Sequence, residues 1–122
     1  MDREELRKHW NTLEDYLAKT FNEGEPMELD AILFLVGLNE LGQGYQRLKK
    51  DQKMDVLHIA ICSLLSPFGY YSYEGHDADG WPHYTLNEKL PPLKPGEQTV
   101  LMKEALVLYF EEEIAKHSIS AE

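Results

Sequence analysis

The chain has 122 residues, of which 43% are hydrophobic and 28% charged, a composition that predicts one globular domain over residues 1–122 and argues against wholesale disorder. Twelve Lys and Arg against 22 Asp and Glu give a formal net charge of −10. Because this charge repels phosphate backbones and anionic lipid, we expect no nucleic-acid or membrane partner, and the acidity would help a basic protein to dock.

The cysteine content and the start of the chain bear on its compartment. A single cysteine, Cys62, excludes an intramolecular disulfide and a zinc site of four cysteines. The first five residues are mostly charged and no apolar run follows them, which is unlike a signal peptide. The longest apolar run, residues 31–38, is far shorter than the about 20 residues of a membrane span. These features predict a cytoplasmic protein.

The first helix is expected over residues 3–21. Asp2 followed by Glu5 fits a capping box at its start. Apolar side chains recur at spacings of four, three and four, which places them on one stripe of a helix. These are Leu6, Trp10, Leu13 and Leu17. We expect this stripe, including Trp10, to lie in the core.

The second helix is expected over residues 26–41, with Pro26 at its first position and Gly42 and Gly44 ending it. Residues 32–38 place apolar side chains all round the axis, so this helix has to be buried on more than one side. A β-strand is the competing interpretation of so short an apolar run, and the length of the segment with its proline start favours the helix.

The third helix is expected over residues 50–65 and should end at the following Ser-Pro pair, because the residue before proline disfavours the helix. One apolar face carries Met54, Leu57, Ile61, Leu64 and Leu65, and a second carries Val56, Ile59 and Ala60. We expect Leu33 and Val36 of the second helix and Leu57 and Ile61 of the third to be core positions. Truncation of any of the four to Ala should cost about 2–4 kcal/mol.

The fourth helix is expected over residues 97–117, followed by a frayed tail over 118–122. Between the third and fourth helices, residues 67–96 form a connection too long to lack structure in a compact domain. Strand-favouring aromatic residues flank an Asp-Gly turn in this connection, which predicts a β-hairpin over residues 70–87. Three prolines, Pro91, Pro92 and Pro95, then predict a stiff extended crossing. The fold class is therefore mainly α, a four-helix bundle-like domain with an inserted hairpin.

Two registers are open to this hairpin. A two-residue turn at residues 79–80 places His76 opposite His83. It also separates the side chains cleanly into an apolar face and a polar face. The apolar face carries Tyr71, Tyr73, Gly75, Pro82, Tyr84 and Leu86, and the polar face carries Ser72, Glu74, His76, Trp81, His83 and Thr85.

The rival register has a four-residue turn over residues 77–80, with Gly80 in a bulge and Asp77 opposite Trp81. It places the two histidines on opposite faces. Local turn chemistry favours this register, because Asp suits the first turn position and Gly the fourth. We nevertheless expect the two-residue turn, because burying each aromatic side chain is worth about 1.5–3 kcal/mol against about one for the turn preference.

The candidate surface for a ligand or partner lies on this hairpin and comprises Tyr73, Glu74, His76, Trp81 and His83. Trp81 lies beside a turn and before a proline, so it should be partly exposed, and tryptophans of this kind are enriched at interfaces. In the expected register, His76 and His83 would have Cβ atoms about 5 Å apart and would be weak candidates for metal ligands. A solvent-facing pair without metal is the simpler interpretation.

His58 and Cys62 are neighbours on the third helix, four residues apart. A thiolate–imidazole pair could serve as a nucleophile. Because His58 falls within the first apolar face and Cys62 at its edge, we expect a packed histidine and an inert buried thiol instead.

No motif identifies an enzyme, a catalytic residue or a cofactor, and none is predicted. The leading hypothesis is a small acidic interaction or accessory module that binds a protein partner or a second copy of itself, because the all-round apolar second helix leaves surface to cover. A metal or small-ligand binder that uses the hairpin is the first alternative. A small enzyme that uses His58, Cys62, His76 or His83 is the second.

Overall fold

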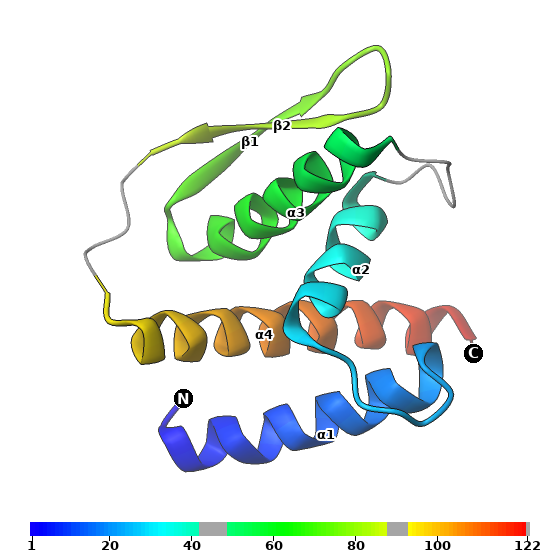
Figure 1. Cartoon of the computed structure of the whole chain (residues 1–122), viewed down its shortest axis with the longest axis vertical. Coiled ribbons are helices and arrows are strands. Elements are labelled where there is room, and N and C mark those ends of the chain that lie inside the picture. The colour runs from blue at the N-terminus through cyan, green and yellow to red at the C-terminus, as the bar shows by residue number, and fades with distance from the viewer. Residues whose placement is uncertain (42–48, 88–92, 122) are drawn as a thin grey trace. The chain divides into compact units, whose positions relative to one another are not determined.

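Within the residues that the structure describes, four helices and one antiparallel hairpin, placed between the third and fourth helices, make up a mainly α fold as predicted (Figure 1). The structure is a computed structural model that describes residues 1–41, 49–87 and 93–121, with side chains up to residue 114. In chain order the elements are α1 (Arg3–Phe21), α2 (Leu29–Leu41), α3 (Lys50–Leu65), the 3₁₀ turn η1 (Ser66–Phe68), β1 (Tyr71–His76), β2 (Pro82–Leu86) and α4 (Pro95–Ala121). Among the described residues, none of the helices combines the length and apolarity needed to cross a membrane.

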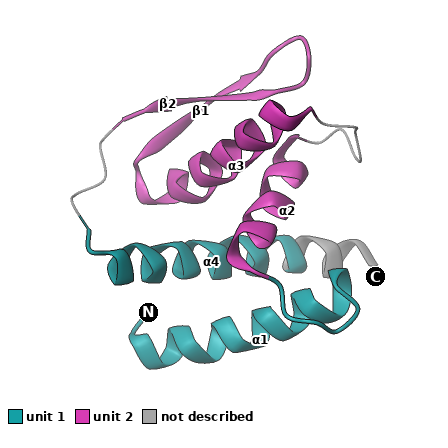
Figure 2. Cartoon of the chain, viewed as in Figure 1, with its two compact units in different colours: residues 1–27, 92–122 teal, residues 28–91 magenta. Residues whose placement is uncertain are grey.

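The chain divides into two compact units (Figure 2). Unit 1 is built from the two ends of the chain, residues 1–27 and 92–122, and holds α1 and α4. Unit 2 is the continuous stretch of residues 28–91 and holds α2, α3 and the hairpin. Segments far apart in sequence therefore pack together in unit 1, whereas unit 2 is formed by one continuous segment of the chain.

In unit 1, α1 has the bounds and the buried stripe that its sequence predicts. The Asp2 side chain accepts a hydrogen bond of 2.8 Å from the backbone N–H of Glu5 and so caps the first turn. Leu6, Trp10, Leu13 and Leu17 are all buried. α1 packs along α4, and the two helices run in the same direction (Figure 1). Their amino-terminal ends therefore lie at one end of the unit.

The bounds of α2 differ from the predicted ones. α2 begins at Leu29 and not at Pro26, and the Asn22 side chain explains the delay. Its amide donates to the backbone carbonyls of Glu25 and Pro26, at 2.9 and 3.2 Å, and this holds the preceding segment in a turn. The predicted glycine ends of α2, Gly42 and Gly44, lie outside the described residues.

α4 is longer than predicted at both ends. It begins at Pro95, because a proline at the first helical position loses no intrahelical hydrogen bond. Pro95 therefore belongs to the helix and not to an extended crossing, while Pro91 and Pro92 lie outside the described residues. The helix continues to Ala121 and so includes most of residues 118–122, the tail that was expected to fray.

In unit 2, α2 packs closely on α3, and this contact selects which face of α3 is buried. Leu33 and Val36 of α2 are buried, as predicted. On α3 the buried side chains are Val56, Ile59, Ala60, Cys62, Leu64 and Leu65. The expected first face is wrong in part, because Met54 is 68% exposed and Leu57 and Ile61 are only half-buried. The second apolar face of α3 is the one that meets α2, since a built Cβ on Gly37 would touch Val56.

The hairpin has the predicted extent but not the expected turn. Asp77 pairs with Trp81 across a four-residue turn, and Gly80 adopts a left-handed φ of 86°. The expected two-residue turn is wrong because the Asp77 carboxylate stabilises the wider one. Its Oδ1 accepts hydrogen bonds from the backbone N–H groups of Asp79 and Trp81, at 2.9 and 3.0 Å.

A second irregularity returns the tyrosines to one face. The register shifts between Tyr73 and Gly75, where Gly75 takes a φ of 108°. Below this bulge, Tyr71 lies opposite Leu86 and Tyr73 opposite Tyr84, so these four side chains share a face. Tyr71 and Tyr84 are half-buried on this face, whereas Tyr73 is 52% exposed.

Candidate functional site

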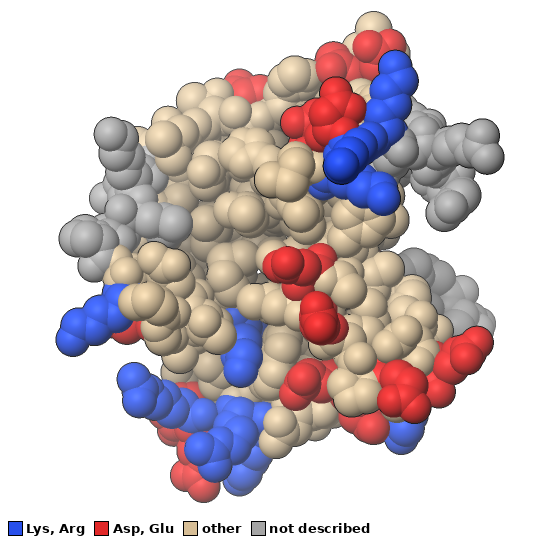
Figure 3. Space-filling view, in the orientation of Figure 1, with Lys and Arg blue, Asp and Glu red and all other residues tan. Residues whose placement is uncertain are grey.

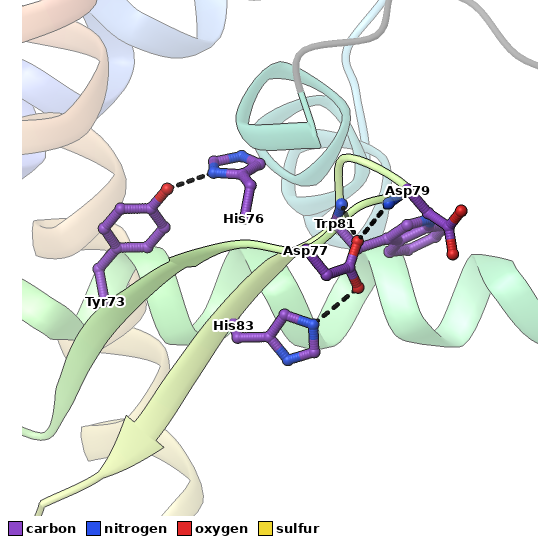
Figure 4. Close-up of polar contacts among 6 residues, drawn as sticks. All are labelled: Tyr73, His76, Asp77, Asp79, Trp81 and His83. Carbon is purple, nitrogen blue, oxygen red and sulfur yellow. Dashed lines mark hydrogen bonds and ion pairs between the residues drawn. The ribbon is translucent and has the colours of Figure 1, made fainter.

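The outer side of the hairpin tip is organised by Asp77. Its Oδ2 lies 2.8 Å from Nε2 of His83, and Trp81 stands beside the pair, half-buried (Figure 4). The hydrogen bond with His83, followed by that from the Trp81 backbone, lowers the pKa of the Asp77 carboxyl. Because this pKa is lower in the folded than in the unfolded chain, the carboxylate stabilises the hairpin above the ordinary carboxyl range. That contribution is lost as the pH falls through the folded-state pKa.

His76 lies on the other side of the hairpin, against the carboxyl-terminal end of α2. Its Nε2 is 3.3 Å from the Glu40 carbonyl oxygen, and its Nδ1 is hydrogen-bonded to the Tyr73 hydroxyl (Figure 4). A carbonyl oxygen can only accept, so in the neutral imidazole Nε2 carries the proton and Nδ1 accepts from the Tyr73 O–H. The Tyr73 oxygen therefore keeps its lone pairs free for another donor.

The two candidate metal ligands are thus separated. His83 is engaged by Asp77, and His76 by Tyr73 and Glu40, so the histidines do not converge on one point. Over the part of the chain that the structure describes, no group of three or more His, Cys, Asp or Glu side chains is placed to hold a metal ion. The rival register, with the histidines on opposite faces, is the one that the hairpin adopts.

An open cleft of about 570 Å³ lies between the tyrosine face of the hairpin and the two helices of unit 2. It is lined by Glu40, Ser63, Ser66, Pro67, Tyr73, His76 and Tyr84. We call it the hairpin cleft. Two of the predicted surface residues, Tyr73 and His76, belong to it, whereas Glu74, Trp81 and His83 do not.

The tyrosine pair forms the aromatic wall of the hairpin cleft. The rings of Tyr73 and Tyr84 have centroids 5.7 Å apart and are tilted by 57°. Burial raises the pKa of the Tyr84 phenol, and the charge of Glu40 raises it further, while a hydrogen bond with Ser63 acts in the opposite direction.

The cleft offers acceptor oxygens to a ligand. Glu40 is the one formal charge among its lining residues, and no described residue forms an ion pair with it. The lone pairs of Tyr73 add a neutral acceptor. The sequence offers no signal that joins Glu40 and Ser63 to Tyr73, because these residues are far apart along the chain and follow no common spacing.

His58 and Cys62 on α3 are in contact, as their spacing predicts, but only one of the two is buried. Cys62 is buried, as predicted, and its Sγ lies 3.5 Å from Nε2 of His58. His58 is exposed and not packed in the core, because α2 covers the opposite apolar face of α3. Its ring instead meets the edge of Tyr71, with centroids 6.5 Å apart.

Burial raises the pKa of the Cys62 thiol, so the neutral thiol should dominate near pH 7. We expect Cys62 of the folded chain to react with iodoacetamide at least about tenfold more slowly than in urea-unfolded chain, because alkylation needs an exposed thiolate. Mass spectrometry of timed samples measures both rates. Equal rates, or faster reaction in the folded chain, would show that His58 activates the thiol.

No protein-family model matches the chain, and comparison with curated proteins and with solved structures finds no match either.

Proposed function

We propose that the protein is an interaction module that binds a basic protein partner through the hairpin of unit 2. The observation that carries this proposal is the joint aromatic and acidic character of residues 70–87, which contain four Tyr, one Trp and three carboxylates but no Lys or Arg. Aromatic side chains provide contact area at interfaces, and a group of carboxylates attracts a basic surface and accelerates its docking.

The hairpin cleft provides a binding site for one basic side chain of the partner. A lysine ammonium carries three donors and no acceptor, which matches the Glu40 carboxylate and the free lone pairs of Tyr73. The Tyr73 and Tyr84 rings offer π faces for a cation–π contact. The cleft therefore favours a cationic side chain over an acidic one.

Several contacts support the surface in one geometry before any partner arrives. At the tip, His76 is held to the Glu40 carbonyl. At the base, the backbone N–H of Asn87 donates to the Tyr70 carbonyl at 2.9 Å. Asn87 also donates through its side chain to Ser72 at 2.6 Å. A surface that is ordered beforehand loses less conformational entropy on binding.

The test is affinity capture from native lysate with immobilised wild type, Trp81→Ala, Glu40→Gln and, as matched control, Asp55→Asn. Asp55 is an exposed carboxylate on α3 outside the hairpin cleft, so its variant changes the net charge equally. We expect a basic protein that is retained by wild type and Asp55→Asn, weakened about tenfold or more by the other two variants, and released by salt.

Circular dichroism must show that each variant is folded. Capture of the same proteins by all four baits would contradict the proposal, as would partners that resist high salt. Sedimentation of the free chain addresses self-association separately, because two acidic hairpins should repel each other. A dimer that survives in wild type but is lost in Trp81→Ala would replace the basic partner with a second copy.

A further inference from the structure

A second cleft, in unit 1, has the opposite charge. It has a volume of about 520 Å³ and lies between the amino-terminal turns of α1 and α4. Four basic side chains line it: Arg3, Arg7, Lys94 and Lys103. Figure 3 shows several Lys and Arg side chains together at this end of the molecule. We call it the basic cleft.

The basic side chains of this cleft lack anionic partners. None of the four forms an ion pair within the described residues, and Glu97 is the single carboxylate among the residues that line the cleft. The chain has 22 acidic residues against 12 basic ones, so four cations with one carboxylate is a marked local reversal of its charge. Unneutralised cations that converge on a concave surface focus a positive potential there.

Lys103 and Trp10 form the floor. The Lys103 ammonium lies 5.3 Å from the centroid of the Trp10 ring, and the lysine is half-buried. A cation that is partly removed from water loses hydration, and an anion bound beside it would restore the lost stabilisation. Leu6 and Val100 extend the floor with apolar surface. The cleft therefore combines an apolar base with a cationic rim.

Helix geometry places these groups together. Arg3, Arg7 and Trp10 follow each other at spacings of four and three, so they share one face of α1. α1 and α4 start at the same end of unit 1 (Figure 1). Arg3 of α1 and Gly96 of α4 line the cleft, so the positive ends of both helix dipoles lie beside it. A Cβ added at Gly96, in the first turn of α4, would meet nothing within 4 Å, so a ligand can approach the backbone there.

We infer that the basic cleft binds a small organic anion, with a carboxylate or phosphate group on an apolar or aromatic body. The guanidinium groups of Arg3 and Arg7 match the oxygens of such a head group and can engage it with paired hydrogen bonds. Lys94 and Lys103 add charge, and the body of the ligand lies on Leu6 and Trp10. This site is independent of the hairpin, since all of its residues belong to unit 1.

Trp10 provides the readout for a test. In a Trp81→Phe background it is the single tryptophan, so its fluorescence reports on the basic cleft alone. Phenyl phosphate and benzoate serve as probes, phenol as the uncharged control and inorganic phosphate as the control without an apolar body. We expect saturable changes with dissociation constants of about 0.1–1 mM for one or both probes, and at least about tenfold weaker binding of each control.

Variants complete the test. Arg3→Gln with Arg7→Gln should weaken the probe at least about tenfold, and Lys103→Gln about threefold or more, because each removes a charge-assisted contact. Lys53→Gln, an exposed position on α3, is the matched control and should bind as the parent does. Both arginines are exposed, so the variants should stay folded by circular dichroism.

Three outcomes would overturn the inference. They are the absence of saturable binding by both aromatic probes, equal binding of inorganic phosphate and phenyl phosphate, and probe affinity unchanged by the double arginine variant. Binding of phenyl phosphate alone, or of benzoate alone, would support the inference and identify the head group. Trp81 and Glu40 take no part in the site, so failure of the proposed partner binding leaves these outcomes unaffected.

Discussion

Gly37→Ala should lower the free energy of unfolding of unit 2 by about 3 kcal/mol, because α2 and α3 approach each other too closely for a side chain at this position. A Cβ on Gly37 would lie 2.2 Å from the Val56 carbonyl oxygen and 2.6 Å from its Cγ1. One of these atoms belongs to the backbone of α3, so a rotamer change cannot relieve the overlap and the helices must separate. The gain of helix propensity from Gly to Ala, about 1 kcal/mol at most, does not offset this cost.

Gly96→Ala is the matched control for this substitution. It places the same methyl group in a helix, at a position where nothing lies within 4 Å. We expect its free energy of unfolding to stay within about 1 kcal/mol of wild type. Urea unfolding followed by circular dichroism measures both variants. Equal stability of Gly37→Ala and wild type would show that α2 and α3 do not meet at this glycine.

Leu64→Ala should cost about 3–4 kcal/mol, and Leu57→Ala on the same helix about 1–2 kcal/mol. Leu64 is 2% exposed, so its truncation leaves a cavity in the core of unit 2, whereas Leu57 is half-buried and its truncation leaves a partly solvated surface. The difference between the two variants is the informative quantity, because both lose the same atoms from one helix. It is measured in the same urea titrations.

A larger cost at Leu57 than at Leu64 would contradict the packing of α3. Such a result would restore the face that its sequence pattern alone favours, in which Leu57 and Ile61 lie in the core beside Met54. Met54 itself is the simplest additional check, since it is 68% exposed and its substitution by Gln should leave the free energy of unfolding within about 0.5 kcal/mol.

The hairpin sequence favours two conflicting registers. Turn chemistry at Asp77 and burial of the tyrosines favour registers that differ by one residue, and a regular hairpin can satisfy only one of them. The chain satisfies both, because Gly75 adopts a positive φ and absorbs the extra residue in a bulge. A glycine inside a strand is the signal that could have indicated this second irregularity.

Part of the candidate site can be predicted from the sequence. The aromatic residues and histidines of the hairpin cluster along the sequence, and two of them, Tyr73 and His76, line the hairpin cleft. Glu40 and Ser63 cannot be predicted in this way, since they reach the cleft from two different helices. The basic cleft gives no sequence signal either, because the net charge of the whole chain conceals a local excess of Lys and Arg.

The elements that depend on neighbouring residues can be predicted from the sequence alone. The stripe of Leu6, Trp10, Leu13 and Leu17 predicts α1, the Ser-Pro pair predicts the end of α3, and the aromatic residues around an Asp-Gly turn predict the hairpin. Each of these follows from backbone geometry within a few residues, which the sequence states directly.

Tertiary packing determines which face of α3 is buried and which residues meet in the two clefts. α3 carries apolar side chains on two sides, and its own pattern favours the larger side, which holds Met54, Leu57 and Ile61. The structure buries the other side, because the absence of a side chain at Gly37 lets α2 approach Val56 and cover it. Leu57 and Ile61 remain half-buried and His58 exposed, since α2 covers Val56 and not the face that they share.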